Sequence, residues 1–245
     1  MILRREPDGF SAVAREWEGG AVAILGGGPS LSAEQIDLVR GAHVAGRLRC
    51  IAVNDAYLVA PWADVCYFAD SHWWRWHSQG IYKPGLGLSA AQVRERFAAF
   101  AGEKCTIQGS GNDVSPRDAH RLRNADYPRH GYGLSLNPRA ITTGSNGGWQ
   151  ACNVAILSGV ATALLLGFDG TPDAEGQTHW HGGHPVQTAG LAYRRYRESF
   201  DAAAQAIRAA GVRVINCNPA SQIDAFEKMT AAAALKLNST SGAHA

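Results

Sequence analysis

Three histidines lie within six residues of one another in the segment T-H-W-H-G-G-H, at His179, His181 and His184. A neutral imidazole has a pKa of about 6.5, which suits it to take a proton from a hydroxyl group. Imidazoles this close can also share one zinc ion. Because no cysteine lies nearby and Gly182 and Gly183 favour a mobile loop, we expect histidines of this segment to act as a general base or to contact a phosphate. A zinc site and a purely structural loop are the alternatives.

A second candidate site is the string G-G-G-P-S-L at residues 26–31, which follows an apolar run and precedes a helix predicted to begin at Ser32 with Gln35 in a capping box. Glycine lets backbone amides approach an anion closely, and the amino end of a helix adds partial positive charge. The dinucleotide fingerprint is incomplete, because Leu31 stands at its third glycine position, and a P-loop is excluded. A tight turn without a ligand is the alternative. The residues expected to bind a nucleotide here are Gly26, Gly27, Gly28, Pro29 and Ser30.

Polar residues also follow four other short apolar runs, at 50–53, 64–68, 163–167 and 212–215, and a T-T-G turn precedes a helix predicted over 145–157. Ligands of parallel sheets bind outside the carboxyl ends of the strands. We therefore expect the nucleotide to contact Asn54, Asp55, Asp70, Asp169 and Asn218, which follow these runs, and Thr142, Thr143 and Gly144, which lie directly before the amino end of that helix. Ser221, whose role is implied only by the family resemblance described below, is added to this set.

The carboxylates of this set allow a competing interpretation. Two of Asp55, Asp70 and Asp169 could hold Mg²⁺ against a di- or triphosphate. Each could instead cap a strand end or contact a ribose hydroxyl. The nucleotide interpretation requires no metal or other cofactor, whereas this one requires Mg²⁺.

Three tryptophans cluster in the segment S-H-W-W-R-W-H, at Trp73, Trp74 and Trp76. Their spacing fits one face of neither a helix nor a strand. Stacking on a sugar or a base, and packing of this segment onto the sheet, are the two interpretations.

The elements that must position these residues are short apolar strands alternating with helices. This pattern predicts an α/β, Rossmann-like fold: a mostly parallel sheet with helices on both faces and an inserted lid segment. We expect one nucleotide-binding domain over residues 1–229, an insertion or lid at about 71–139, and a flexible tail at 230–245.

The composition of the chain limits the classes of partner that we expect it to bind. The 245 residues carry 23 Lys plus Arg against 21 Asp plus Glu, a net charge of +2, which gives no surface for bulk nucleic acid. The longest apolar stretch, 154–168, is shorter than the about 20 residues that span a bilayer. Five separated cysteines and the lack of a secretion signal predict a cytoplasmic protein with reduced thiols. Whether it forms a homo-oligomer stays open.

Six motifs together resemble a known family. They are G-G-G-P-S-L at 26–31, Asn54, I-T-T-G at 141–144, G-F-D at 167–169, the histidine loop at 179–184 and C-N-P-A-S at 217–221. Their order resembles the sialyltransferases of glycosyltransferase family 42 over nearly the whole chain, with 71–139 unmatched. The amino-terminal signature also resembles a domain-of-unknown-function family that includes hydroxymethylpterin pyrophosphokinases.

The first resemblance implies that Gly27, Gly28, Ser30 and Asn54 hold a cytidine nucleotide, that residues 142–144 contact the donor's phosphate and sugar, and that His184 is the base. The family carries tyrosines after the G-[IF]-D strand that stabilise the departing phosphate. Residues 169–184 contain none, so Arg139, His179 or Tyr132 would have to replace them.

The sequence therefore predicts a nucleotide-dependent transferase, most similar to a glycosyltransferase, that uses a nucleotide-activated sugar, a histidine base and an unknown acceptor. The alternatives are an Mg²⁺-dependent pyrophosphokinase of the pterin or thiamin type and a nucleotide-binding protein without catalysis.

Overall fold

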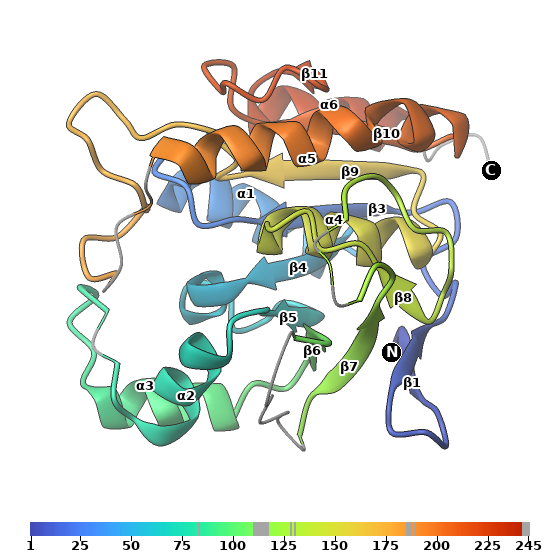
Figure 1. Ribbon diagram of the computed structural model, residues 1–245. Helices are drawn as coiled ribbons and strands as arrows, with labels where there is room; N and C mark the ends of the chain where they lie inside the picture. Colours follow the sequence, from blue (N-terminus) through green and yellow to red (C-terminus); the bar gives the residue numbers. More distant parts are fainter. Residues whose placement is uncertain are drawn as a thin grey trace.

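The computed structural model describes residues 1–82, 84–109, 118–127, 129, 131–184, 188 and 190–241. Within these residues, nine strands form one sheet in which every neighbouring pair is parallel (Figure 1). The predicted α/β, Rossmann-like class is confirmed. In the order β11-β10-β9-β3-β4-β5-β6-β7-β8, the strands are β11 (Glu227–Lys228), β10 (Arg213–Asn216), β9 (Thr162–Leu166), β3 (Ala21–Leu25), β4 (Arg49–Val53), β5 (Val65–Tyr67), β6 (Glu103–Ile107), β7 (His120–Asn124) and β8 (Ala140–Ile141).

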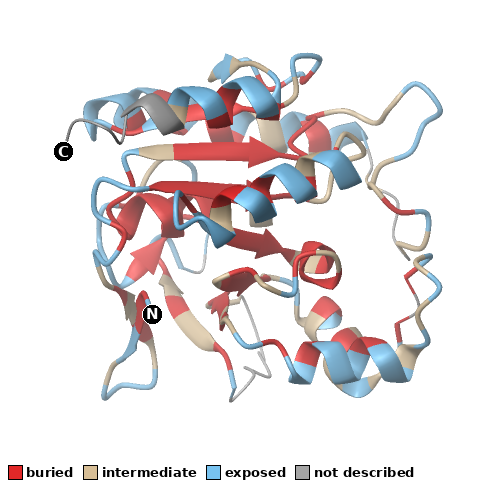
Figure 2. Ribbon diagram, turned by 180° about the vertical axis from the view of Figure 1, so that it is seen from behind, coloured by how far each residue is buried: buried red, intermediate tan, exposed pale blue. Residues whose placement is uncertain are grey.

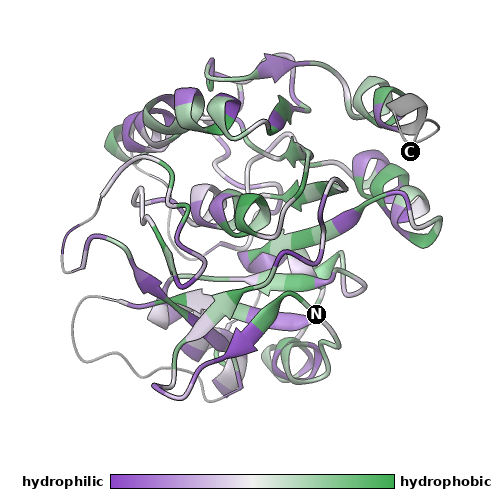
Figure 3. Cartoon of the chain, turned by 90° about the vertical axis from the view of Figure 1, so that its right-hand side faces the viewer, coloured by the Kyte–Doolittle hydropathy of each residue, from purple (hydrophilic) through white to green (hydrophobic). Residues whose placement is uncertain are grey.

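Helices cover both faces of the sheet because the central strands are apolar on both sides (Figure 2). Val22 and Ile24 of β3 pack in one buried cluster, and Ala23 and Leu25 in the other. Figure 3 shows the same layering, with hydrophobic strands between helices that carry hydrophilic residues outward. The first face carries α4 (Gly147–Leu157) and α5 (Gly190–Ala209), and the second carries α1 (Ala33–Val44), α6 (Ala231–Ser241), α2 (Ser71–Gln79), α3 (Ala90–Ala98) and the 3-10 helix η1 (Asn54–Leu58).

A small antiparallel hairpin of β1 (Leu3–Arg5) and β2 (Ser11–Val13) completes the amino-terminal part. Among the described helices, none is both long and apolar enough to cross a membrane.

The capping box predicted for α1 is present, since the Ser32 hydroxyl accepts from the Gln35 amide and the Gln35 side chain accepts from the Ser32 amide. Helix α4 begins two residues later than predicted. Ser145 has a φ of 52°, which no helix accommodates, and Asn146 caps the helix by accepting from the amides of Gly148 and Trp149.

The segment 71–139 is more than an insertion on the sheet. Strands β6 and β7 lie within it and extend the sheet beyond β5. Leu122 of β7 is fully buried, but its neighbours Arg121 and Arg123 are polar, so β7 carries almost no apolar signal in the sequence. Helices α2 and α3, on the second face, pack against each other (Figure 1).

The predicted flexible tail is wrong up to residue 241, because residues 231–241 form α6. This helix buries Ala231, Ala234 and Leu235 against the second cluster and packs on α1. The low sequence complexity of this segment suggested a flexible tail. Its alanines instead favour a helix, since alanine is the strongest helix former and its small side chain packs closely against a neighbouring helix.

The chain order of the strands marks one place in the sheet for a ligand. From β3 the chain proceeds stepwise to β8, then returns to the other side of β3 as β9 and continues to β11. The connections after β3 and β9 therefore diverge, which opens a crevice at their carboxyl ends.

Candidate functional site

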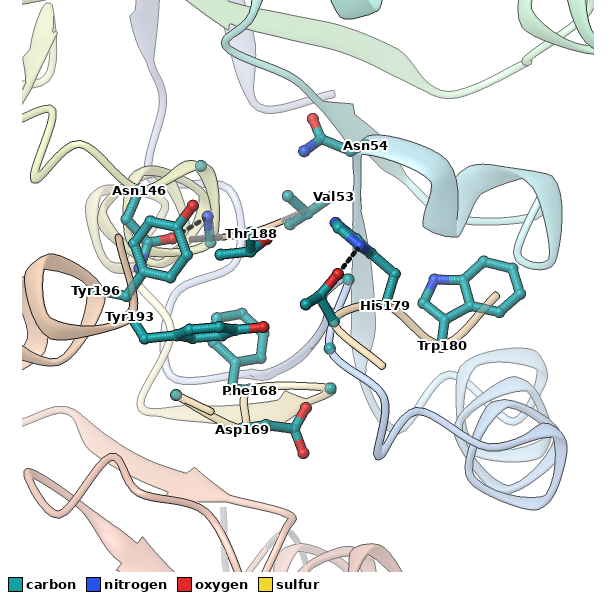
Figure 4. Close-up of a pocket in the computed structure, with 18 of the residues that line it drawn as sticks. Val53, Asn54, Asn146, Phe168, Asp169, His179, Trp180, Thr188, Tyr193 and Tyr196 are labelled. Atoms are coloured by element: carbon teal, nitrogen blue, oxygen red, sulfur yellow. Dashed lines mark hydrogen bonds between the residues drawn. The ribbon is translucent and has the colours of Figure 1, made fainter. Parts of the chain in front are cut away.

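A cavity of about 160 Å³ lies at this switch point. Its walls come from the turns after β3 and β9, the end of β4, the amino end of α4, the histidine loop and α5 (Figure 4). It opens into a wider groove of about 770 Å³ that runs over the ends of β4 to β8 and shares Asn54, Asn146, His179, His184 and Tyr196 with it. Together they form one continuous depression at the carboxyl ends of the strands.

Gly26 and Gly28, which follow β3, allow the carboxyl ends of β3 and β9 to approach each other closely. A Cβ on Gly26 would lie 2.7 Å from the Gly167 carbonyl oxygen, and one on Gly28 would lie 1.9 Å from Asp169 Oδ2. The Gly28 amide donates to the Gly167 carbonyl at 2.9 Å. Gly27 is different, since its nearest neighbour would be the His179 ring at 3.7 Å. Gly26, Gly27 and Gly28 all line the cavity, whereas Pro29 and Ser30 do not.

Asp169 is held by protein groups on both oxygens. Its Oδ1 accepts from Asn218 at 2.7 Å, and its Oδ2 accepts from the Ser30 amide at 3.4 Å. Burial raises the pKa of Asp169, and these hydrogen bonds oppose the rise. Ser221 is buried and donates to the Phe168 carbonyl oxygen. Ser30, Asn218 and Ser221 therefore shape the turn after β9, and none of the three lines the cavity.

Asn54 lies at the carboxyl end of β4 with a left-handed φ of 51°. Such a conformation is strained for a residue other than glycine and is often found at functional sites. Its Oδ1 is buried, has no partner among the described residues, and belongs to a residue that lines both the cavity and the groove. Asn54 thus presents an unpartnered amide oxygen at the cavity, and its contact with a nucleotide stays a prediction.

The T-T-G turn contributes less than expected. The Thr142 hydroxyl donates to the Gly133 carbonyl and accepts from Trp149 Nε1 at 2.9 Å, so it is engaged inside the protein. Gly144 packs against Trp149, and only Thr143 reaches the wall of the groove. The residues that face the cavity come just after the turn, at Asn146, Gly147 and Gly148. These three residues were not predicted at the site, because a helix that begins at Ser145 would include them.

The two predicted catalytic histidines lie together at the cavity. The rings of His179 and His184 stack with centroids 3.8 Å apart and planes 11° apart. His179 Nδ1 shares a hydrogen bond of 2.8 Å with the Thr178 hydroxyl. Burial, together with His184 and His181, lowers the pKa of His179 to about 4. His179 is therefore neutral near pH 7, as a general base must be.

Two tyrosines that the sequence analysis did not assign to the site complete the cavity. Tyr193 and Tyr196 extend from α5 on the side opposite His179 (Figure 4). Burial raises the pKa of both phenols, so they remain protonated donors. Their spacing of three residues on a helix was the available signal. Of the substitutes proposed from sequence, His179 lines the cavity, whereas Arg139, which pairs with Glu6 at 2.6 Å, and Tyr132, which is 43% exposed, line neither the cavity nor the groove.

Each of the three candidate Mg²⁺ ligands is held by protein donors; Asp55 and Asp169 line the cavity, and Asp70 lines the groove. Asp55 accepts from Trp73 and Tyr82, Asp70 caps α2 through the His72 amide, and Asp169 is held as described above. Over the residues whose placement is described, no three histidine, cysteine or acidic side chains are grouped so that they could bind a metal ion.

The tryptophans of α2 divide between core and groove. Trp73 is 3% exposed and stacks on His77, with centroids 3.9 Å apart, so it belongs to the core although its edge reaches the groove wall. Trp74 packs partly buried against the second cluster. Trp76 is half-buried, stacks near Tyr82 and lines the groove, which leaves it as the indole best placed to meet a substrate.

Neither a protein-family model nor a curated protein matches this chain. Two solved structures have a similar fold. The MAf glycosyltransferase from Magnetospirillum magneticum AMB-1 is similar over 94% of this chain and 37% of its own, with a TM-score of 0.54 and 15% identity. The sialyltransferase CstII from Campylobacter jejuni, in complex with the substrate analogue cytidine-5'-monophosphate (CMP), is similar over 87% of this chain and 86% of its own, with a TM-score of 0.46 and 12% identity. The first likeness shows that the fold is glycosyltransferase-like, and the chain spans little more than a third of that glycosyltransferase.

Replacing Gly28 by alanine should destabilise the protein, because the new Cβ would meet both Asp169 Oδ2 and the Gly167 carbonyl. We expect a loss of about 1–3 kcal/mol in the free energy of unfolding, which is the usual cost of overpacking. Gly27→Ala is the matched control, since its Cβ meets nothing closer than 3.7 Å. Urea denaturation of both variants measures this, and equal losses in the two would contradict the steric account.

Lowering the pH should destabilise the fold partly through His179. The unfolded chain takes up a proton on this ring at about pH 6.5, whereas the folded protein resists until about pH 4. The stability contributed by the neutral ring is therefore complete above about 6.5 and falls towards 4. In His179→Gln, the midpoint of urea denaturation should fall less between about pH 6.5 and 4 than it does in the unsubstituted protein. The control is His72→Gln, since His72 is exposed, and its midpoints should follow those of the unsubstituted protein. Parallel curves for all three proteins would refute the shifted pKa.

Proposed function

We propose that this chain is a glycosyltransferase-like enzyme that binds a nucleotide-activated sugar in the crevice between β3 and β9 and transfers the sugar with a histidine as base. One observation carries the proposal: the cavity at the carboxyl ends of β3 and β9 is lined both by the amino end of α4 and by the stacked rings of His179 and His184. The glycosyltransferase-like fold and the order of the six sequence motifs support it.

The charge of the site favours a nucleoside monophosphate donor. No lysine or arginine in the described part of the chain lines either the cavity or the groove. A phosphate would be held instead by the Gly147 amide at the amino end of α4, whose first turn contains no acidic residue, and by the hydroxyls of Tyr193 and Tyr196. Neutral donors can satisfy one phosphate, whereas a di- or triphosphate usually requires cations.

In the proposed reaction, an acceptor hydroxyl attacks the anomeric carbon of the sugar and gives its proton to His184. The bond between that carbon and the phosphate oxygen breaks, and the nucleotide leaves with the electron pair. Hydrogen bonds from Tyr193 and Tyr196 stabilise the negative charge that develops on the leaving phosphate. Asn54 and Gly27 lie where the nucleoside would contact the turns after β4 and β3.

Thermal-shift measurements with CMP, UMP, GMP, AMP and ATP, each with Mg²⁺ or with EDTA, should show stabilisation by CMP to the same extent in both conditions. The His184→Ala variant should retain this CMP shift and lose at least about 100-fold in the release of CMP from a CMP-activated sugar, because it removes the base. His72→Ala is the matched control, since this ring is exposed away from the cavity.

The other outcomes discriminate the competing functions. Stabilisation by ATP that requires Mg²⁺ would favour the pyrophosphokinase. A CMP shift without turnover of any CMP-activated sugar would favour a binding protein. No response to any nucleotide would refute the proposal.

A further inference from the structure

Asp55 is a buried carboxylate that joins three separate segments of the chain. It is 4% exposed and follows Asn54 at the end of β4. Its Oδ1 accepts from Trp73 Nε1 at 2.6 Å, and its Oδ2 accepts from the Tyr82 hydroxyl at 2.5 Å and lies 2.9 Å from His181 Nε2. A carboxylate in this position is costly to bury unless such donors surround it.

The Oδ2 atom of Asp55 ties the histidine loop to the segment that follows α2. Tyr82 belongs to that segment, and His181 lies between the two stacked histidines along the chain. The two segments also touch through their backbones, since a Cβ on Gly183 would lie 1.8 Å from the Gly85 amide nitrogen. In Figure 1 the loop after β9 and the segment after α2 meet at the same edge of the molecule.

His181 is buried and lies between the two stacked histidines along the chain, so its position limits where they can lie. Its side chain is 2% exposed, and it is separated by two residues from His179 and by three from His184. The Trp180 amide also donates to the Gly27 carbonyl at 3.2 Å, and the Trp180 side chain packs against the second cluster. The contact with Asp55 is made by the residue that lies between the two stacked histidines along the chain, so it bears directly on where their rings lie over the cavity.

We infer that Asp55 is a positioning residue that acts through His181 to hold the stacked pair of His179 and His184 over the cavity. The inference rests on the proposed function only for the catalytic use of that pair. Burial raises the pKa of Asp55, but its interactions with His181, His77 and Tyr82 outweigh burial and hold it well below the usual range. The carboxylate is therefore charged at every pH at which the enzyme would work, and it can keep accepting from His181 Nε2.

The test compares the variants Asp55→Asn, His181→Gln and the double variant. The matched control is His77→Gln, because His77 Nε2 also lies near this carboxylate, at 3.1 Å, but on the α2 side. We expect Asp55→Asn and His181→Gln each to lower kcat for CMP release from a CMP-activated sugar by roughly 10- to 100-fold, since small displacements of catalytic groups cost this much. The dissociation constant of CMP should change by less than about threefold. The double variant should be no worse than the more severe single variant, because both remove one linkage.

A second measurement does not depend on turnover. In histidine-labelled protein, the NMR signals of the His179 and His184 rings should shift or broaden in Asp55→Asn and in His181→Gln, and should stay in place in His77→Gln. Unchanged signals in the first two variants, or additive losses of kcat in the double variant, would overturn the inference. If Asp55→Asn fails to fold, His181→Gln alone decides, and because the NMR result stands without transferase activity, failure of the proposed function would remain distinguishable.

Discussion

The close approach of the ends of β3 and β9 is the constraint on which the site depends. Gly26 and Gly28 leave no room for a side chain against Gly167 and Asp169, so the two turns meet backbone to backbone. This contact fixes Asp169 under the first turn, where Ser30 and Asn218 hold it. The diverging connections beyond the contact leave the crevice, and α4, α5 and the histidine loop close around it. Gly26 and Gly28 resemble residues that bind a ligand, but their main role is to let the two turns that form the cavity wall approach each other.

The crevice is electrostatically simple. Among the described residues its walls carry amides, hydroxyls and imidazoles and no lysine or arginine, in keeping with the low net charge of the chain. The two carboxylates that line it, Asp169 and Asp55, both accept hydrogen bonds from protein donors. The half-buried, neutral His179 stacks on His184, the base of the proposed reaction, and the protonated phenols of Tyr193 and Tyr196 lie on the opposite side, where that reaction places the departing phosphate.

The sequence predicted the elements whose signal is local. The apolar runs predicted the parallel sheet, the Ser32–Gln35 pair predicted the start of α1, and the strand ends predicted the edge at which Asn54 lies. It could not predict what depends on distant partners. Thr142 looks like a ligand residue until Trp149 and Gly133 occupy its hydroxyl, and Asp55 looks like a metal ligand until Trp73 and Tyr82 surround it. Tyr193 and Tyr196 were missed because they come from α5, beyond the loop in which tyrosines were expected.

The most direct test of the central claim, that this crevice receives a nucleotide without a metal, is a crystal structure of the protein with CMP in the presence of EDTA. The account predicts the phosphate at the amino end of α4, within hydrogen-bond distance of the Gly147 amide and of Tyr193 or Tyr196, with the nucleoside near Gly27 and Asn54. CMP bound elsewhere, or a crevice that stays empty of nucleotide at saturating CMP, would contradict it.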